Sequence, residues 1–307
     1  MMSLDIAILL LAAAVQSGTP ILYATLGEIV TEKVGILNLG VEGMMMVGAL
    51  AGFIAALYTG QASLAFLVGG LAGALLAALH GLVCIGFQGN QVVSGLALTI
   101  LGTGLADYLG TPFVGQKVTG FAPVALPLLS AIPGLGPVFF KQDPLVYGSY
   151  LIVPLLWLFF RNTKWGLRMR SVGEYPEAAF AAGLPVHLYR WAGVIGGGFL
   201  VGLGGAYLSL AYTHLWTSGM SAGRGWIAVA LVIFAFWRPE RALIGAYLFG
   251  GIMAFQLRLQ AMGTHIPSSL LLMLPYGLTV LVLVLSSRKG TRAQSPAALG
   301  INIEPAE

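Results

Sequence analysis

The chain has 307 residues, of which only 8% are charged and 58% are hydrophobic, and its mean hydropathy is +0.89. A soluble protein has about 25% charged residues and cannot cover a globule of this size without them, which excludes a soluble enzyme or binding protein. No Asp, Glu, Lys or Arg occurs in the stretches 6–27, 43–106, 191–223 and 259–287. Because a membrane-crossing helix needs about 20 apolar residues, we expect a polytopic α-helical membrane protein.

The net charge of +4 does not indicate nucleic-acid binding, because the basic residues lie in short loops between apolar runs. Cys84, the single cysteine, lies inside an apolar run and indicates neither a disulfide nor a redox compartment. The first apolar run has no basic residue before it and continues to about Leu26. We therefore expect a retained first helix and not a signal peptide.

Polar or proline-rich segments separate the apolar runs, and each run predicts one helix. In chain order, the predicted helices cover about 6–26, 35–58, 62–87, a stretch that follows the turn at 88–91 and ends near 107, then 145–160, 191–212, 222–237, 242–257 and 268–287. The connection 112–144 holds six prolines, and the connection 161–190 is charged. We expect an all-α transmembrane bundle of about nine helices (eight to ten) over residues 1–287, followed by a disordered cytoplasmic tail over 288–307.

Nine crossings place the two termini on opposite sides of the membrane, and the basic residues indicate which side is cytoplasmic. One side collects Lys33, Arg161, Lys164, Arg168, Arg170, Arg190, Arg238, Arg241, Arg288, Lys289 and Arg292. The other side has Lys117, Lys141, Arg224 and Arg258. The N-terminus is therefore expected outside and the C-terminus in the cytoplasm. The segment 222–237 rises only about 24 Å through a core of about 30 Å, so a re-entrant segment there is the alternative.

Other residue patterns exclude several kinds of chemistry. The 43 glycines are about twice the average share, and we interpret them as surfaces for close helix packing. No lysine follows a glycine-rich loop as in a P-loop, so we expect no ATP site in this chain. The four histidines lie in separate elements, and no nucleophile and base are paired, so we expect no metal, no cofactor and no catalytic residue.

The stretch 35–43 carries the most informative polar residues. Its three glycines, with Asn38 and Glu42 four residues apart, predict that the second helix starts as a broken or unwound half-helix. An ionisable residue in this position is a functional candidate, although Glu42 could instead cap a neighbouring helix end. Polar residues recur on the fourth helix as Asn90, Gln91, Ser94 and Thr99. Their alternative role is hydrogen bonding between helices.

The charged connection contains a second candidate element. Pro176 followed by Glu177 predicts a helix start, and Gly183 with Pro185 predicts its end. A helix of about seven residues is not stable alone, so this one needs a partner surface. The alternative is that this helix lies on the lipid headgroups at the membrane surface.

Three stretches of the chain resemble one family. Residues 32–43 read Glu-Lys-Val-Gly-Ile-Leu-Asn-Leu-Gly-Val-Glu-Gly, which resembles the signature of permease subunits of ABC importers in the branched-chain amino acid and simple-sugar group. The form Asn-Leu-Gly-x-Glu-Gly is most similar to the nucleoside permeases, and departs from the Gly-x-x-Asp-Leu-Ser-x-Gly pattern of sugar permeases. Residues 166–184 resemble the loop that contacts the ATPase in this group, and 223–246 resemble a later segment.

The resemblance implies a permease subunit of a bacterial ABC importer in the plasma membrane, for nucleosides. It implies a substrate path with Asn38, Glu42, Asn90, Gln91 and Ser94, and a coupling element with Gly173, Glu174, Pro176, Glu177, Ala178, Ala179 and Gly183. It also implies an ATPase subunit that holds ATP and Mg²⁺, a second permease subunit in a heterodimer, and a substrate-binding lipoprotein. The alternatives are a sugar or branched-chain amino acid permease, or an ion-coupled transporter that uses Glu42 or Asp107.

Overall fold

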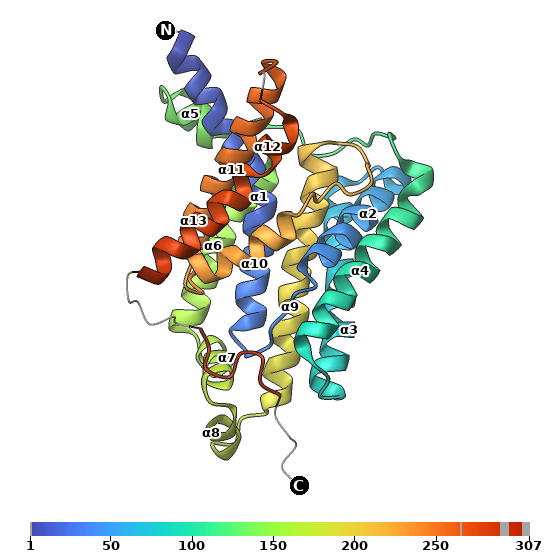
Figure 1. Cartoon of the computed structure of the whole chain (residues 1–307), viewed down its shortest axis with the longest axis vertical. Coiled ribbons are helices and arrows are strands. Elements are labelled where there is room, and N and C mark those ends of the chain that lie inside the picture. Colours follow the sequence, from blue (N-terminus) through green and yellow to red (C-terminus); the bar gives the residue numbers. More distant parts are fainter. Residues whose placement is uncertain (1, 265, 289–294, 303–307) are drawn as a thin grey trace.

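The computed structural model describes residues 2–264, 266–288 and 295–302. Figure 1 shows that most long helices run along the length of the molecule, with the start of α1 and the segment 295–302 at opposite ends. The helices are α1 (Met2–Glu32), α2 (Val41–Thr59), α3 (Ala62–Gly81), α4 (Gln91–Gly110), α5 (Leu135–Phe139), α6 (Pro144–Asn162), α7 (Lys164–Glu174), α8 (Pro176–Ala181), α9 (Val186–Tyr207), α10 (Arg224–Phe234), α11 (Pro239–Ala261), α12 (Ser268–Leu272) and α13 (Leu274–Arg288).

Short elements complete the described part of the chain. A π-helical turn prolongs α3 over Leu82–Gly86, and another prolongs α9 over Leu208–Tyr212. The strands β1 (Val124–Ala125) and β2 (Lys141–Gln142) pair antiparallel within the proline-rich connection. The helical content confirms the predicted all-α fold.

Among the described residues, seven helices are long and apolar enough to cross a membrane: α1, α2, α3 and α9 with their π-turns, α4, α6 and α11. Two shorter apolar helical stretches, Arg224–Phe234 and Leu270–Leu281, bring the bundle to the predicted size. The chain is therefore a multi-pass membrane protein.

The predicted helix over 222–237 is shorter than expected. Gly223 and Ala222 have positive φ angles of 79° and 48° and prevent a helix before Arg224. Phe236 and Trp237 have positive φ angles of 52° and 54°, so the helix ends at Phe234. Its 11 residues rise only about 16 Å, so α10 does not cross a membrane by itself.

The chain nevertheless passes from one end of the bundle to the other between α9 and α11. Residues 210–216 pair through their backbone with 115–121 of the long connection at one end. At the other end, the Trp237 indole donates a hydrogen bond to the Glu32 carboxylate. One crossing is therefore made by α10 together with the loop that precedes it. Arg238 lies at the same end as Lys33, as predicted.

The core is centred on α9, which packs closely against its neighbours through glycine. A Cβ added at Gly205 would lie 1.9 Å from the Met45 carbonyl oxygen, and one added at Gly202 would lie 2.4 Å from that of Gly69. Only glycine allows these backbones to approach so closely, which confirms the packing role predicted for the glycine runs.

The charged connection forms two helices at the end of the bundle that holds Lys33 (Figure 1). The predicted short helix is confirmed as α8, which starts at Pro176 and spans six residues, and Gly183 follows it with a φ angle of +78°. The preceding helix α7 was not predicted. Thr163 starts α7, because its hydroxyl oxygen accepts a hydrogen bond from the Gly166 N–H at 3.0 Å.

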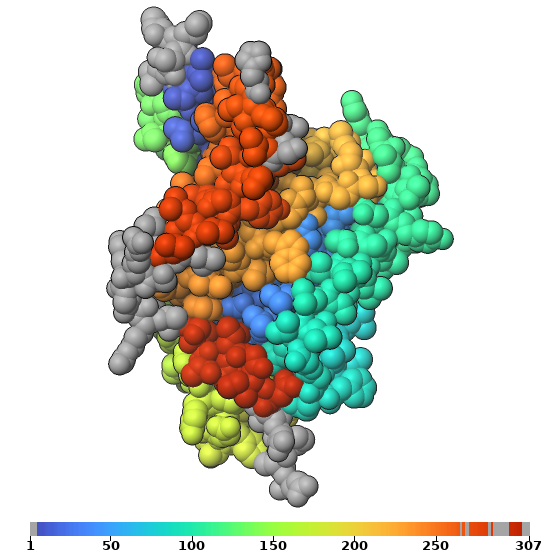
Figure 2. All heavy atoms as spheres, in the orientation of Figure 1, coloured from blue at the N-terminus to red at the C-terminus, as the bar shows by residue number. Residues whose placement is uncertain are grey.

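Part of the C-terminal stretch differs from the expected disorder. Residues 295–302 hydrogen-bond to the body of the protein, for example from Gly300 N–H to the Gly35 carbonyl at 3.1 Å. Figure 2 shows this segment in dark red between the yellow-green α7–α8 region and the teal α3–α4 region. The predicted tail residues 289–294 and 303–307 lie outside the described residues.

Candidate functional site

The chain between α1 and α2 is not helical and is mostly buried, and the glycines of 35–43 predicted this unwound start of the second helix. Residues 36–40 form no helix, and side chains of α3 and α4 contact their backbone. Gln91 Oε1 accepts from Leu37 N–H at 2.7 Å, and His80 Nε2 lies 3.0 Å from the Leu37 carbonyl oxygen. Thr99 donates to the Leu39 carbonyl at 2.7 Å. Irregular backbone persists inside a membrane protein only where such partners satisfy it.

Asn38 stabilises the same segment from within. Its side-chain oxygen accepts from Gly40 N–H at 2.9 Å, and its amide nitrogen donates to Glu28 at 3.2 Å. Asn38 is 1% exposed and Glu28 is 0% exposed. The side chain is therefore committed to the unwound segment in this conformation.

Glu42 connects the start of α2 to the start of α10. One carboxylate oxygen accepts from Ser221 Oγ at 2.6 Å and Gly223 N–H at 2.8 Å, and the other accepts from Gly225 N–H at 2.6 Å. A Cβ on Gly225 would lie 2.5 Å from Cα of Glu42, so glycine permits this approach. The negative charge stabilises the positive N-terminal end of α10. This geometry matches the alternative in which Glu42 caps a neighbouring helix, and its place on a substrate path stays a prediction.

The other predicted path residues fall into two places. Ser94 is buried with its hydroxyl 3.0 Å from His80 Nδ1, close to the unwound segment. Gln91, also buried, binds that segment directly. Asn90 is exposed at the start of α4, where its side chain accepts from Val93 N–H at 3.0 Å. The structure thus gathers Asn38, Gln91 and Ser94 around residues 36–40, places Glu42 at α10, and leaves Asn90 at a helix cap.

A cavity beside the start of α10 holds polar residues that the sequence analysis did not select. It measures about 350 Å³ and lies between α10, α11 and α13, with Arg224, Gln256 and Tyr276 among its lining residues. Arg224 is 6% exposed, donates to the carbonyls of Met220 and Ser221, and has an Nε with no partner in the described part of the chain. A buried cation between membrane helices is a functional candidate. The triplet Gly-Arg-Gly before an apolar run was its sequence signal.

The structure also buries a pair of carboxylates at the end of α1 that the sequence analysis did not select. Glu28 and Glu32 are 0% and 2% exposed, because α1 continues to Glu32 and does not end near Leu26. Their spacing of four residues places both on one helix face. That spacing was the signal in the sequence.

The predicted coupling residues divide between a buried and an exposed set. Gly173 packs so tightly that a Cβ there would lie 2.3 Å from the Lys33 carbonyl oxygen. Pro176 and Ala179 are buried as well. The exposed members are Glu174, Glu177, Ala178 and Gly183. Tyr175 and Phe180, which sequence analysis missed, are 64% and 60% exposed on the same element.

The segment 295–302 lies between the coupling element and the unwound segment 36–40. Its Ala298 N–H donates to the Gly173 carbonyl at 2.9 Å beside α8. Asn302 accepts from the Gln91 amide at 2.9 Å and donates to the Gln88 carbonyl at 2.6 Å. One short segment therefore contacts both the coupling element and the residue that holds the unwound backbone.

Comparison with known proteins agrees with the resemblance drawn from the sequence motifs. The chain is 36% identical over 303 residues to the nucleoside ABC transporter permease protein NupC of Lactococcus lactis, covering 92% of this chain and 93% of NupC. It is 33% identical over 309 residues to the guanosine ABC transporter permease protein NupQ of Bacillus subtilis, covering 95% of each chain. It is 48% identical over 257 residues to TsgC13 of Haloferax volcanii, provisionally a glucose ABC transporter permease protein, covering 82% of this chain and 78% of TsgC13.

A solved structure has the same fold. It is an ABC transporter, provisionally of the metal-chelate type, in an inward-facing conformation. The TM-score is 0.51 at 16% sequence identity, covering 90% of this chain and 85% of the other. The family model described as "Branched-chain amino acid transport system / permease component" matches residues 9–283. The chain belongs to this family of ABC transporter permease subunits.

Proposed function

We propose that this chain is the permease subunit of an ABC importer for nucleosides and forms half of the substrate path. The observation that carries the proposal is the match to NupC and NupQ over more than nine-tenths of the chain. The motif of residues 38–43 supports the same substrate class.

The chemistry of the interior suits a neutral, hydrogen-bonding substrate. Asn38, Gln91 and Ser94 around the unwound segment carry amides and a hydroxyl, and the cavity at α10 adds Gln256 and Tyr276. A nucleoside is neutral at pH 7 and offers several donors and acceptors. The proposed path includes these groups together with Glu42, Asn90 and Arg224, and opens when α2 and α10 separate during transport.

Energy for transport comes from a separate ATPase in this proposal. Members of the family work with an ATPase, and α8 with its exposed Tyr175 and Phe180 is the proposed contact. ATP and Mg²⁺ stay on that partner, and this chain supplies no catalytic residue. A second, different permease subunit and a substrate-binding lipoprotein complete the importer.

The proposed orientation follows from the charges. Lys33, Arg161, Arg170 and Arg238 lie at one end of the bundle, which we assign to the cytoplasm by the positive-inside rule. The N-terminus is then outside and segment 295–302 inside, and the membrane is the bacterial plasma membrane. Cysteine labelling at position 241 from outside would contradict this orientation.

Sugar transport is the second candidate, because TsgC13 is the relative with 48% identity and is provisionally a glucose permease. A nucleoside also contains a pentose, so the two substrates share part of their hydrogen-bonding surface. The two substrates differ in that a nucleoside carries an aromatic base and a sugar does not.

Uptake in cells separates the candidates. The chain is expressed together with the proposed ATPase, second permease and binding lipoprotein in a host without nucleoside uptake, and labelled guanosine and labelled glucose are supplied in parallel. We expect ATP-dependent accumulation of guanosine that unlabelled guanosine, and not glucose, prevents. Accumulation of glucose alone would replace the nucleoside proposal with the sugar one, and guanosine uptake that persists without ATP would overturn the ABC mechanism.

A further inference from the structure

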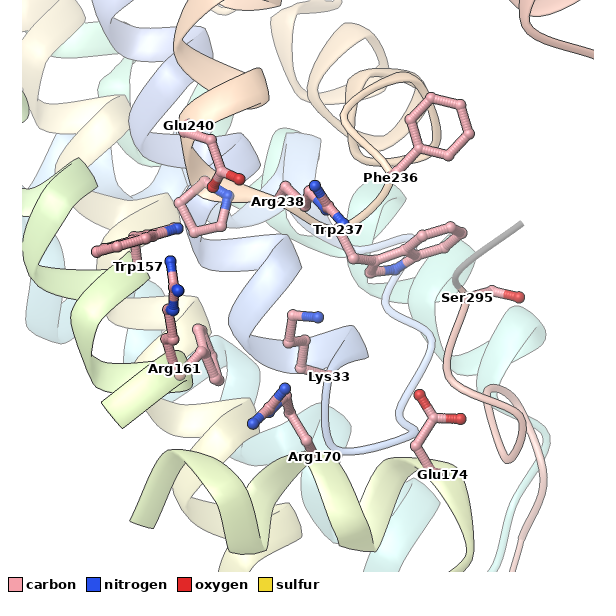
Figure 3. Close-up of a pocket in the computed structure, with 12 residues that line it drawn as sticks. Lys33, Trp157, Arg161, Arg170, Glu174, Phe236, Trp237, Arg238, Glu240 and Ser295 are labelled. Carbon is pink, nitrogen blue, oxygen red and sulfur yellow. The ribbon is translucent and has the colours of Figure 1, made fainter. Parts of the chain in front are cut away.

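A cavity of about 630 Å³ at the end of the bundle that holds Lys33 gathers positive charge and aromatic rings (Figure 3). It lies where α1, α6, α7 and the α10–α11 connection meet. The cationic lining residues are Lys33, Arg161, Arg170 and Arg238, and the aromatic ones are Trp157, Phe160, Phe236 and Trp237. Two carboxylates, Glu174 and Glu240, also line it. The lining therefore has an excess of positive charge.

The two carboxylates of the lining, Glu174 and Glu240, only partly balance these four cations. In the part of the chain that the structure describes, none of them forms an ion pair, and the buried Arg170 Nε has no hydrogen-bond partner. Arg161 lies over the Trp157 ring at 4.8 Å and Lys33 over the Phe160 ring at 5.8 Å. Burial, followed by the charge of Arg170, lowers the pKa of Lys33 to about 8. An anion in the cavity would relieve this repulsion.

The cavity lies at the end of the apolar helix α6, the level at which we place the membrane–water interface. Trp157 and Arg161 belong to the last turns of α6, which ends at Asn162, and tryptophan and arginine are common at the membrane–water interface. The neighbouring surface of α6 exposes Leu151, Leu155 and Leu158, by 61%, 52% and 42%. Their spacing puts them along one face of the helix, where acyl chains can lie below a headgroup in the cavity.

We propose that this cavity binds the phosphate-bearing headgroup of an anionic membrane phospholipid. Basic pockets between transmembrane helices on the cytoplasmic side suit such headgroups, and guanidinium groups match phosphate oxygens with paired donors. A volume of about 630 Å³ exceeds what a phosphate alone fills and accommodates a glycerol phosphate headgroup. The bound lipid would connect α6 to α7, the helix that precedes the coupling element α8.

The test measures lipid binding to the full-length purified chain by native mass spectrometry. Phosphatidylglycerol, phosphatidylcholine and inorganic phosphate are the three probes. Arg161 and Arg238 are exposed, so the double variant Arg161→Gln/Arg238→Gln removes cavity charge without opening the core, although the contact of Arg161 with the Trp157 ring is also removed. The matched control is Lys164→Gln/Arg168→Gln, which removes two exposed charges at the same end of the molecule but outside the cavity.

We expect phosphatidylglycerol to bind at least tenfold tighter than phosphatidylcholine, and the cavity variant to lose about 30-fold in affinity. The control variant should keep the affinity of the parent within about twofold. Equal losses in both variants would show an unspecific surface-charge effect and overturn the proposal. Displacement of the lipid by millimolar inorganic phosphate would assign the cavity to free phosphate instead. Binding of phosphatidylcholine as tight as that of phosphatidylglycerol would also refute it.

Discussion

At the junction of α2 and α10, both carboxylate oxygens of Glu42 accept hydrogen bonds, and Gly225 approaches without a side chain between the helices. At α8, by contrast, Tyr175 and Phe180 leave 64% and 60% of their surfaces exposed, and Gly183 has open space around it. In the first region, groups of the same chain provide the hydrogen-bond partners of the polar side chain. The second region exposes large apolar side chains, as a surface that binds another protein does. Substitutions in the first should therefore affect stability, and those in the second should mainly affect transport.

The largest effect is expected for Gly225→Val at the junction. The added Cβ would lie 2.5 Å from Cα of Glu42 and 2.6 Å from its carboxylate oxygen, so α2 and α10 must separate. We expect a loss of about 3 kcal/mol of stability, visible as a lower melting temperature of the purified protein. The control is Gly196→Val on α9, where an added Cβ meets nothing within 4 Å. Equal melting of both variants would show that the junction is not tightly packed.

At α8, Gly183→Trp should abolish ATP-driven uptake while insertion stays normal, and its melting temperature should fall no more than that of a control with the same backbone strain. Gly183 has a φ angle of +78°, and a bulky side chain there enters the space in which we place the ATPase. Glu177→Arg should have the same effect by reversing an exposed charge. Gly60→Trp is the matched control, because Gly60 also has a positive φ angle of 66° and open surroundings but follows α2 at the other end. Normal uptake by Gly183→Trp would refute the docking role.

A smaller effect is expected for Glu42→Gln, which keeps the shape of the side chain and removes its charge and titratable proton. The amide can still accept through one oxygen, but the second oxygen that binds Gly225 N–H is replaced by a donor. Uptake should fall several-fold, remain ATP-dependent and keep the pH profile of the parent. A variant that loses accumulation but retains pH-independent exchange would favour an ion-coupled transporter.

The segment 295–302 lies between the two regions, and Asn302→Ala removes its contacts to the α3–α4 turn. The Gln91 amide then loses one partner, while the Gln91 bond to Leu37 N–H remains. We expect a stability loss of about 1 kcal/mol and faster amide hydrogen exchange over residues 36–40. The substitution Ile301→Ala, at an exposed neighbour on the same segment, should leave that exchange unchanged. Unaltered exchange in Asn302→Ala would show that the segment does not support the unwound backbone.

The smallest effect concerns the pH dependence of the basic cavity. With a pKa of about 8, Lys33 is protonated at pH 7 and mostly neutral at pH 9. The groups that face it are Arg170 and Glu174 on α7 and Arg238 and Glu240 at the start of α11. Phosphatidylglycerol binding should therefore weaken about fivefold from pH 7 to pH 9, which is the contribution of one cation to the affinity for an anionic lipid. The decrease should disappear in Lys33→Gln, and an unchanged decrease there would assign it to another group.

The sequence alone determined the features that depend on local patterns. Apolar runs of membrane-crossing length predicted the all-α bundle, and Pro176 and Gly183 predicted the limits of α8. Proline fixes its own φ angle at a helix start, and glycine readily adopts the positive φ angle that follows a helix end. Three glycines around Asn38 likewise indicated the unwound start of α2. These properties reside in a few neighbouring residues.

Only the tertiary structure decided which polar groups meet. Glu42 binds residues about 180 positions further along the chain, and Gln91 binds Asn302 across 211 positions. Glu28 and Glu32 are buried because α1 extends past its apolar run and packs inside the bundle. Hydropathy describes whether a residue prefers lipid or water, but the partner of a buried polar group depends on which helices pack together. That choice depends on the close glycine contacts of α9 with its neighbours, which no single segment of the sequence specifies.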